Sequence, residues 1–394
     1  MFDDIPLIDD HAHPMLPPEA AAREPFARYF SEGHDSDTVA RHAPNALFYR
    51  QALRELAGLL GCEVSEQAVV ATRAAQPFEG YLRRLLTEAG VEAVLLDDGY
   101  PRAGAFSSAE TAAILGTVQE SDSPRDREGQ VRVRRVQRLE RLIEDLLPAH
   151  ESLASLETAM IGELGAARPE LAALKSVIAY RSGLAITRPD RAEVERAQAE
   201  ARVGATHASP SGQGEARVVP TNRLTSKPLL DHLVPLAAEW AAGQGLPLQL
   251  HTGFGDRDVD LRLANPLHLR PLLEGGALSR GPVVLLHASY PYVREAAYLA
   301  SVYPNVYVDF SQAAPLLAGP ALTRVLEELL ALAPVTKILY GSDAWGIPEW
   351  FWLAARAARR ALANALAWLP AAEASWAARR ILHDNAAELY GLGA

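Results

Sequence analysis

The sequence has little cysteine and no long uninterrupted run of apolar residues. Cys62 is the only cysteine among 394 residues, so an intrachain disulfide and a thiolate metal cluster are both excluded. No stretch of about 18 uncharged apolar residues is present, which argues against a transmembrane helix. The first residues also lack the basic and apolar segments of a signal peptide. We therefore expect a cytoplasmic protein that does not interact with membranes.

Lysine is scarce as well, and positive charge is in deficit. The formal net charge is −11, which argues against a nucleic-acid partner bound through a broad basic surface. Of the 38 basic residues only Lys175, Lys227 and Lys337 are lysines. None of them follows a glycine, so a Walker A phosphate-binding loop is excluded.

Short apolar, β-branched runs alternate with longer segments in which apolar residues recur every three or four positions. The predicted strands are residues 5–10, 91–96, 131–138, 174–180, 246–251, 283–287, 306–310 and 338–341. Strands that alternate with helices indicate a parallel sheet, and eight such units favour a closed (β/α)₈ TIM barrel. A doubly wound open sheet is the alternative.

The spacing of these strands along the chain is uneven. About 80 residues separate the first and second predicted strands, far more than one crossover helix requires. We expect residues 17–90 to form a mostly helical insertion after the first strand. No internal repeat or low-complexity linker divides the chain, so residues 1–394 are predicted to form a single barrel domain.

Five polar side chains fall where a predicted strand gives way to a turn. His11 and His13 follow the first strand, His251 and His287 end the fifth and sixth, and Asp343 follows the eighth. In a (β/α)₈ barrel the carboxyl ends of all strands open onto one face, where active sites lie. Imidazole and carboxylate together suit Zn²⁺, Mn²⁺ or Fe²⁺. A single buried histidine could be a core residue, but five such positions on one rim indicate a metal site.

Lys175 lies among apolar residues in the fourth predicted strand. A buried ammonium group is costly unless it is paired, neutralised or modified. An ion pair with a carboxylate in the barrel interior is therefore the alternative to a functional role.

The positions of these residues resemble the amidohydrolase superfamily of metal-dependent hydrolases. The C-terminal ILHDNAAELYGL is similar to the closing helix of its amidohydrolase-related (amidohydrolase 2) branch. The segments LLDDGYP, VRRVQRLE, LKSVIAYRSGL, DLRLANPLHLRPLL and YGSDAWG resemble a subgroup that includes the N-terminal domain of FluG-type proteins and bacterial TIM-barrel hydrolases.

The resemblance implies a metal-ligand set. His11, His13 and Asp343 would hold one ion and His251 and His287 a second, most simply Zn²⁺, with Mn²⁺ or Fe²⁺ as alternatives. Lys175 would be carbamylated by CO₂ and bridge the two ions. Many members of the branch keep one ion, which here would use His11, His13, Asp343 and His251.

The resemblance also implies hydrolysis of a C–N amide bond by metal-activated water. Asp343 would move the proton, and His287 would stabilise the developing oxyanion. Five residues at strand ends are the predicted substrate contacts: Asp98, Tyr100, Arg138, Tyr180 and Arg181. Because arginine pairs with carboxylates, we expect a small substrate that carries a carboxylate. FluG-type domains sit beside glutamine-synthetase-like domains, so the resemblance suggests a γ-glutamyl amide.

Two other functions stay open at this point. A non-oxidative decarboxylase or a uronate-isomerase-like enzyme would use the same superfamily site for a different reaction. A non-catalytic binding protein with this fold would need a degraded ligand set, whereas every ligand position here is filled. A homo-oligomer is the default expectation for a chain of this kind.

Overall fold

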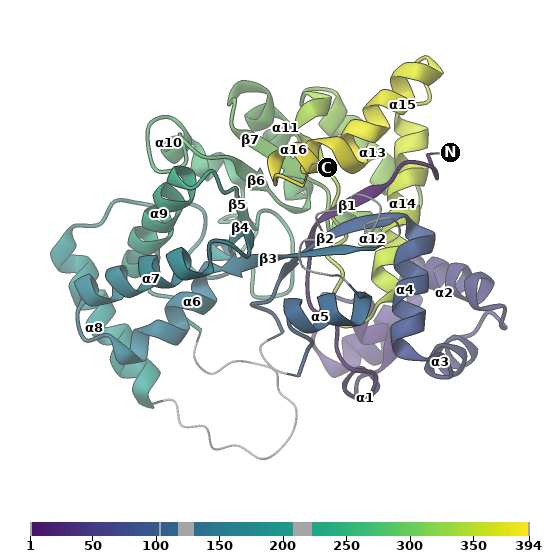
Figure 1. The fold of residues 1–394 in the computed structure, drawn as a ribbon, viewed down its shortest axis with the longest axis horizontal. Helices are drawn as coiled ribbons and strands as arrows, with labels where there is room; N and C mark the ends of the chain where they lie inside the picture. The colour runs from purple at the N-terminus through teal and green to yellow at the C-terminus, as the bar shows by residue number, and fades with distance from the viewer. Residues whose placement is uncertain (1, 102–103, 117–129, 208–222, 393–394) are drawn as a thin grey trace.

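Eight parallel strands form one sheet in which neighbours in sequence are neighbours in space (Figure 1). The computed structural model describes residues 2–101, 104–116, 130–207 and 223–392. The strands are β1 (Leu7–Ala12), β2 (Val91–Asp97), β3 (Arg132–Arg138), β4 (Leu171–Ser176), β5 (Leu248–Leu250), β6 (Val283–Leu285), β7 (Val306–Asp309) and β8 (Ile338–Leu339).

The segment that follows β8 closes this sheet into a barrel. The backbone N–H of Asp10 donates to the Tyr340 carbonyl at 3.0 Å, and the N–H of Asp343 donates to the His11 carbonyl at 2.8 Å. These bonds join the last strand to β1, so no open sheet edge is left there. The predicted (β/α)₈ TIM barrel is confirmed, and the alternative of an open doubly wound sheet is wrong.

The fourth strand differs from its prediction of residues 174–180. β4 begins at Leu171 and ends at Ser176, and a short 3-10 helix follows at Ile178–Tyr180. The Glu140 carboxylate accepts hydrogen bonds from the Ser176 hydroxyl at 2.6 Å and the Val177 N–H at 3.0 Å. This carboxylate turns the chain out of the sheet, although the apolar run itself is typical of a strand.

Helices connect the strands and cover the outside of the barrel. Between β1 and β2 lie α1 (Pro18–Ala21), a 3-10 helix (Phe26–Phe30), α2 (Leu47–Leu60), α3 (Glu66–Ala74) and α4 (Phe78–Ala89). The later helices are α5 (Ser108–Leu115), α6 (Leu139–Leu146), α7 (Leu153–Ala167), α8 (Arg191–His207), α9 (Lys227–Gly243), α10 (Arg270–Leu273), α11 (Val293–Val302), α12 (Ala313–Leu316), α13 (Pro320–Leu330), α14 (Glu349–Ala365), α15 (Ala371–Arg379) and α16 (Asn385–Leu389).

Figure 1 shows α2, α3 and α4 gathered on one side of the barrel beside α14, and α4 packs against α14. The status of residues 17–90 as an insertion and the single domain 1–394 stay predictions. Within the described residues no helix is long and apolar enough to cross a membrane.

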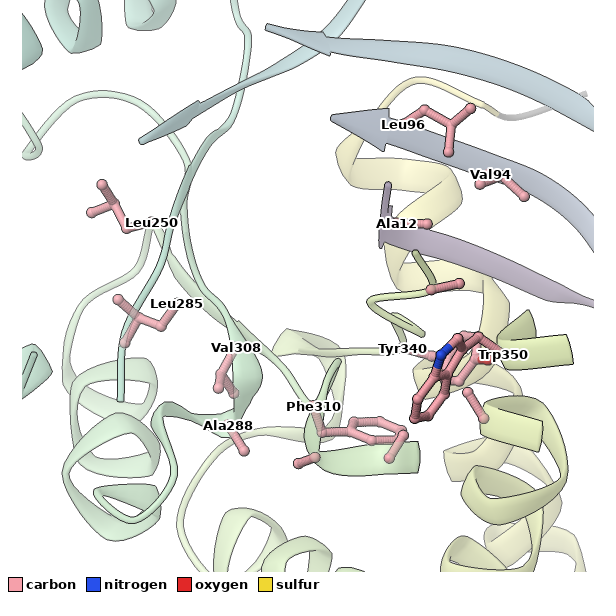
Figure 2. Close-up of a cluster of buried hydrophobic side chains, with 14 of the residues drawn as sticks. Ala12, Val94, Leu96, Leu250, Leu285, Ala288, Val308, Phe310, Tyr340 and Trp350 are labelled. Carbon is pink, nitrogen blue, oxygen red and sulfur yellow. The ribbon is translucent and has the colours of Figure 1, made fainter. Parts of the chain in front are cut away.

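Side chains along each strand alternate between two buried clusters, as the two-residue period of a strand requires. Val94 and Leu96 on β2 belong to the larger cluster between strands and helices, part of which Figure 2 shows. Ala93 and Leu95 belong to a second cluster that gathers residues from most of the strands and so fills the barrel interior. The next inward position on β2 is Asp97, which is fully buried. The interior therefore changes from apolar to polar towards the carboxyl ends of the strands.

The opposite end of the barrel is filled by the end of the described chain. Tyr390 and Leu392, which follow α16, belong to the interior cluster. The Tyr390 hydroxyl donates to Asp10 Oδ2 at 3.1 Å and lies 3.1 Å from Gln249 Nε2. A C-terminal side chain thus reaches residues directly beneath the polar end of the barrel.

Candidate metal centre

His11, His13 and Asp343 converge at the carboxyl ends of β1 and β8. His11 Nε2 and His13 Nε2 each lie 3.3 Å from Asp343 Oδ1, and one ligand atom from each residue falls within 4.8 Å of the others. Both histidines are buried. Asp343 has a positive φ of 54°, and strained backbone of this kind concentrates at functional sites.

The hydrogen bonds around the two imidazoles fix which nitrogen is unprotonated. His11 Nδ1 lies 3.1 Å from Gln249 Oε1, and His13 Nδ1 lies 3.1 Å from the Asp97 carbonyl. Both partners are acceptors, so each Nδ1 carries the proton and each Nε2 is left with a lone pair. These lone pairs face Asp343 Oδ1, a buried oxygen without a hydrogen-bond partner among the described residues. Three electron-pair donors facing one another fit a divalent cation.

Lys175 lies at the floor of the same site and is 1% exposed. Its Nζ is 2.9 Å from His11 Nε2, and within the described part of the chain no carboxylate lies within 4.0 Å of it. Burial lowers the pKa of Lys175 to about 8, with Asp97 opposing that shift and Arg138 adding to it. The expected alternative, a direct ion pair to a carboxylate, is therefore absent from the described contacts.

His251 and His287 form a second pair of imidazoles next to the first. His287 Nε2 lies 2.9 Å from His251 Nδ1, and the rings of His11 and His287 are 5.6 Å apart. His251 Nε2 faces the Phe254 carbonyl at 3.0 Å, so its Nδ1 is the unprotonated nitrogen. His287 Nδ1 lies 2.9 Å from the Ser311 hydroxyl. His287 Nε2 therefore donates to His251 Nδ1, which carries the lone pair of this second pair of imidazoles.

Burial controls the protonation of these groups. It lowers the pKa of His11 to about 4, with Lys175 adding to the shift, and it holds the pKa values of His251 and His287 well below their usual range. For Asp343 burial acts against ionisation, but His287, His11 and His13 hold its pKa well below the usual range. His11, His251 and His287 are therefore neutral and Asp343 is ionised at neutral pH, which are the forms that bind metal.

A pocket of about 130 Å³ opens above these residues. His13, Lys175, His251, His287 and Asp343 line it together with residues from several loops. A larger cavity of about 460 Å³ lies elsewhere, between α2, α13 and α14. None of the converging histidines lines that cavity, so the smaller pocket is the candidate active site.

Comparison with known proteins places the chain in a family. The amidohydrolase family model matches residues 8–392. The chain belongs to the amidohydrolase family. The expected superfamily membership is thereby confirmed, and the chain is an enzyme-family member with a candidate site for a divalent metal.

Two relatives narrow the comparison within the amidohydrolases. Protein fluG of Emericella nidulans is 33% identical over 389 residues, which cover 91% of this chain and 42% of that protein. The chain thus spans about two fifths of the length of this curated relative. A crystal structure of a provisionally named metal-dependent hydrolase from Lactobacillus casei is 30% identical, with a TM-score of 0.81 over 99% of this chain and 96% of that one.

A more distant amidohydrolase-fold structure shows the same architecture. The uronate isomerase of Thermotoga maritima has a TM-score of 0.62 over 98% of this chain and 95% of that chain, but only 13% identity. At this low sequence identity, the structural similarity shows that the two chains share a fold. It does not show which reaction the present protein catalyses.

Four of the five predicted substrate-contact residues line the pocket, and Asp98 does not. Tyr100, Tyr180 and Arg181 line the pocket. Arg138 lines it too, but its guanidinium is paired with the buried Asp97. Its Nε donates to Asp97 Oδ2 at 2.9 Å, and one Nη donates to the same oxygen at 2.5 Å. Asp98 does not line the pocket and pairs with Arg135 at 2.8 Å.

The Asp97–Arg138 pair lies beside His13, one of the candidate metal ligands. Burial opposes ionisation of Asp97, but the guanidinium of Arg138 holds the pKa of Asp97 well below its usual range. Its backbone carbonyl receives the His13 Nδ1 hydrogen bond. The guanidinium of Arg138 is thus engaged by Asp97, and its substrate contact stays a prediction.

Several pocket residues lie in the connections that follow the strands and were not predicted from the sequence. Arg28, Glu32 and His34 lie after β1, and Gln312 and Trp345 follow β7 and β8. His34 Nε2 lies 3.3 Å from Asp256 Oδ2, and both residues line the pocket. Loops carry no periodic signal that would locate such residues.

Proposed function

We propose that this protein is a metal-dependent hydrolase that cleaves the C–N bond of an amide in a small substrate carrying a carboxylate. One observation carries the proposal. The unprotonated Nε2 atoms of His11 and His13 converge with Asp343 Oδ1 at the floor of a pocket. A divalent cation held by these three residues would polarise the amide carbonyl and lower the pKa of water.

The residues of the chain divide the remaining tasks. Asp343 is ionised and lies beside the ligands, so it can accept a proton from water and return it to the leaving amine. His287 lies next to His251 at the same floor and would face the developing oxyanion. Zn²⁺ is the ion that best suits two imidazoles and a carboxylate.

Two arginines that line the pocket, Arg28 and Arg181, form the proposed binding site for the substrate carboxylate. Arg181 Nε is buried without a hydrogen-bond partner among the described residues, although an Nη of the same guanidinium lies 3.4 Å from Glu144. The guanidinium of Arg28 stacks over the Trp345 ring at 5.2 Å and donates to the Ser31 carbonyl. Guanidinium groups placed in this way can bind a carboxylate. A γ-glutamyl amide satisfies these requirements.

Carbamylation of Lys175 forms part of the proposal. Its Nζ would attack the carbon of CO₂, forming an N–C bond and releasing a proton, and the resulting anion would bridge two cations. Burial without a carboxylate partner supports this modification. Native mass spectrometry would show a gain of one CO₂ that Lys175→Met abolishes, whereas an unmodified lysine in the metal-loaded protein would reject the bridging role.

Metal analysis and product identification test the reaction itself. Purified protein should contain about one or two equivalents of Zn, Mn or Fe, and amine should be released from a panel of carboxylated amides. The variants H11A, H13A and D343N should remain folded and lose both metal and activity. Folded wild-type protein that binds no metal would refute the proposal, and CO₂ release or sugar-acid isomerisation would favour the other superfamily reactions. Cytoplasmic location and a homo-oligomeric state stay predictions.

A further inference from the structure

The loop Ser31–His34 holds a carboxylate over the mouth of the pocket. The 3-10 helix Phe26–Phe30 precedes it and is fixed by aromatic packing. Phe30 stacks on Trp350 with ring centroids 4.8 Å apart, and Tyr29 lies 5.1 Å from Trp345. Within the loop, a Cβ on Gly33 would come within 2.7 Å of Thr38 Cγ2. The loop is therefore tightly packed, and Glu32 is held as part of the pocket lining.

The carboxylates of this pocket differ in the partners they have. Asp343 faces the Nε2 atoms of His11 and His13, and Asp256 faces His34. Glu32 forms no ion pair within 4.0 Å among the described residues, although it shares the pocket with Arg28. Of the three lining carboxylates, Glu32 is thus the one that no imidazole faces within the described residues.

Gln312 supplies a second unmatched acceptor beside Glu32. Its side chain is 5% exposed and forms a hydrogen bond with the Glu32 carboxylate. A carboxylate only accepts, so the amide nitrogen of Gln312 donates and its oxygen points elsewhere. That Oε1 is buried and has no partner among the described residues. The backbone of Gln312 also has a positive φ of 54°, a conformation that costs free energy and is kept where it serves a site.

We propose that Glu32 and Gln312 Oε1 bind an ammonium group of the substrate, so that the enzyme acts on amides of amino acids in their zwitterionic form. This inference rests on the proposed function and adds a cationic group to the carboxylate already proposed. An ammonium carries three donors and a positive charge, which match one carboxylate and one amide oxygen. Arg181 and Arg28 would bind the carboxylate of the same substrate.

The electrostatics of Glu32 agree with this assignment. Burial raises the pKa of Glu32 to about 7, the hydrogen bond from Gln312 opposes the shift, and the charges of Asp343 and Asp256 add to it. A half-buried carboxylate near two other carboxylates is stabilised in its ionised form by a cationic ligand.

The test compares two amides that differ only in the ammonium group. The substrates are L-γ-glutamyl p-nitroanilide and glutaryl p-nitroanilide, and release of p-nitroaniline by the metal-loaded full-length protein gives kcat/KM. The wild type should prefer the glutamyl compound by about tenfold or more, the usual effect of a charge-assisted hydrogen bond. E32Q should lose this preference and retain activity on the glutaryl compound. E24Q removes the same charge from an exposed position outside the pocket and should keep the preference.

Binding separates a failure of this inference from a failure of the proposed function. Calorimetry with L-glutamate and glutarate on the same three proteins should show the same discrimination and its loss in E32Q. If neither amide is cleaved but E32Q still abolishes the preference for glutamate, the proposed hydrolysis fails and the ammonium site stands. If E32Q weakens both compounds by the same factor, or if the wild type does not distinguish them, the ammonium site is refuted.

Discussion

Gln249→Leu would remove the support beneath one candidate metal ligand. Gln249 is fully buried on β5. Its Oε1 accepts from His11 Nδ1 at 3.1 Å, and its Nε2 donates to the Asp10 carbonyl at 2.7 Å and lies 3.1 Å from the Tyr390 hydroxyl. Leucine has a similar size but supplies none of these bonds, so the N–H of His11 and the carbonyl of Asp10 each lose this partner.

The expected magnitudes follow from the count of lost partners. A buried polar group left unsatisfied costs about 1–3 kcal/mol, so two such groups should lower the free energy of unfolding by about 2–6 kcal/mol. Loss of the partner that orients a metal-binding histidine typically weakens metal binding by about 10–100-fold. The variant should therefore unfold at lower urea concentration and also bind Zn²⁺ more weakly.

Two assays and one control separate these effects. Competition with a chromophoric chelator measures Zn²⁺ affinity, and urea unfolding of the metal-free protein measures stability. Gln198→Leu is the matched control, because Gln198 is 2% exposed on α8 and donates one hydrogen bond to the His150 carbonyl at 2.8 Å. It should lose stability and keep its metal affinity. Unchanged Zn²⁺ affinity in Gln249→Leu would refute the claim that Gln249 orients His11.

Three further predictions concern the stability of the protein and involve residues in or beside the pocket. Arg138→Met should lower the free energy of unfolding by about 3–5 kcal/mol in urea, because it leaves the buried Asp97 carboxylate unpaired. Gly253→Ala should lower the melting temperature, because Gly253 has a φ of 74° and an added Cβ would overlap the backbone of Ser289–Tyr290. Glu32→Gln should make the free energy of unfolding less dependent on pH. The pKa of Glu32 is raised from 4.5 to about 7 in the folded protein, so between these pH values the folded state holds a proton that the unfolded state releases. The stabilisation from this proton is lost as the pH rises from 4.5 through about 7, and glutamine cannot contribute it.

Each of these three predictions has a control, or a result that would contradict it. Arg141→Met breaks an exposed pair with Asp145 and should change stability by at most about 1 kcal/mol; an equal loss in Arg138→Met would contradict the buried-pair argument. Gly58→Ala places its Cβ in open space within α2 and should not destabilise, so a similar loss at both glycines would count against the overlap. Parallel urea stabilities of wild type and Glu32→Gln between pH 5 and pH 8 would show that Glu32 titrates normally.

The site residues that could be predicted from the sequence are those that follow the ends of strands. His11, His251, His287 and Asp343 follow apolar runs, and the topology of a barrel brings such positions to one rim. The residues that the sequence did not indicate come from tertiary contacts. Glu32 stands in a loop fixed by aromatic packing, and the importance of Gln249 depends on which atoms its amide meets across the barrel.

The predicted end of the fourth strand was wrong because it, too, depends on a tertiary contact. The run Val177–Tyr180 has the composition of a strand, yet Glu140 binds Ser176 and Val177 and ends β4 there. Intrinsic preference is a weak signal that a single buried carboxylate can override. Likewise the ion pair of Arg138 could not be predicted from the sequence, because its partner Asp97 lies on the neighbouring strand β2.

The joining of β1 to the segment after β8 has a consequence for how the protein is made. The hydrogen bond from Ser342 N to Asp9 spans 333 positions of the sequence. At about 5–20 residues per second, ribosomal synthesis of that interval takes roughly 15–70 s. During this time His11 and His13 have emerged while Asp343, and Tyr390 beneath Gln249, do not yet exist. The nascent chain therefore lacks the complete set of candidate ligands, and a metal ion held by all of them would bind only after the last strand has been translated and closed against the first.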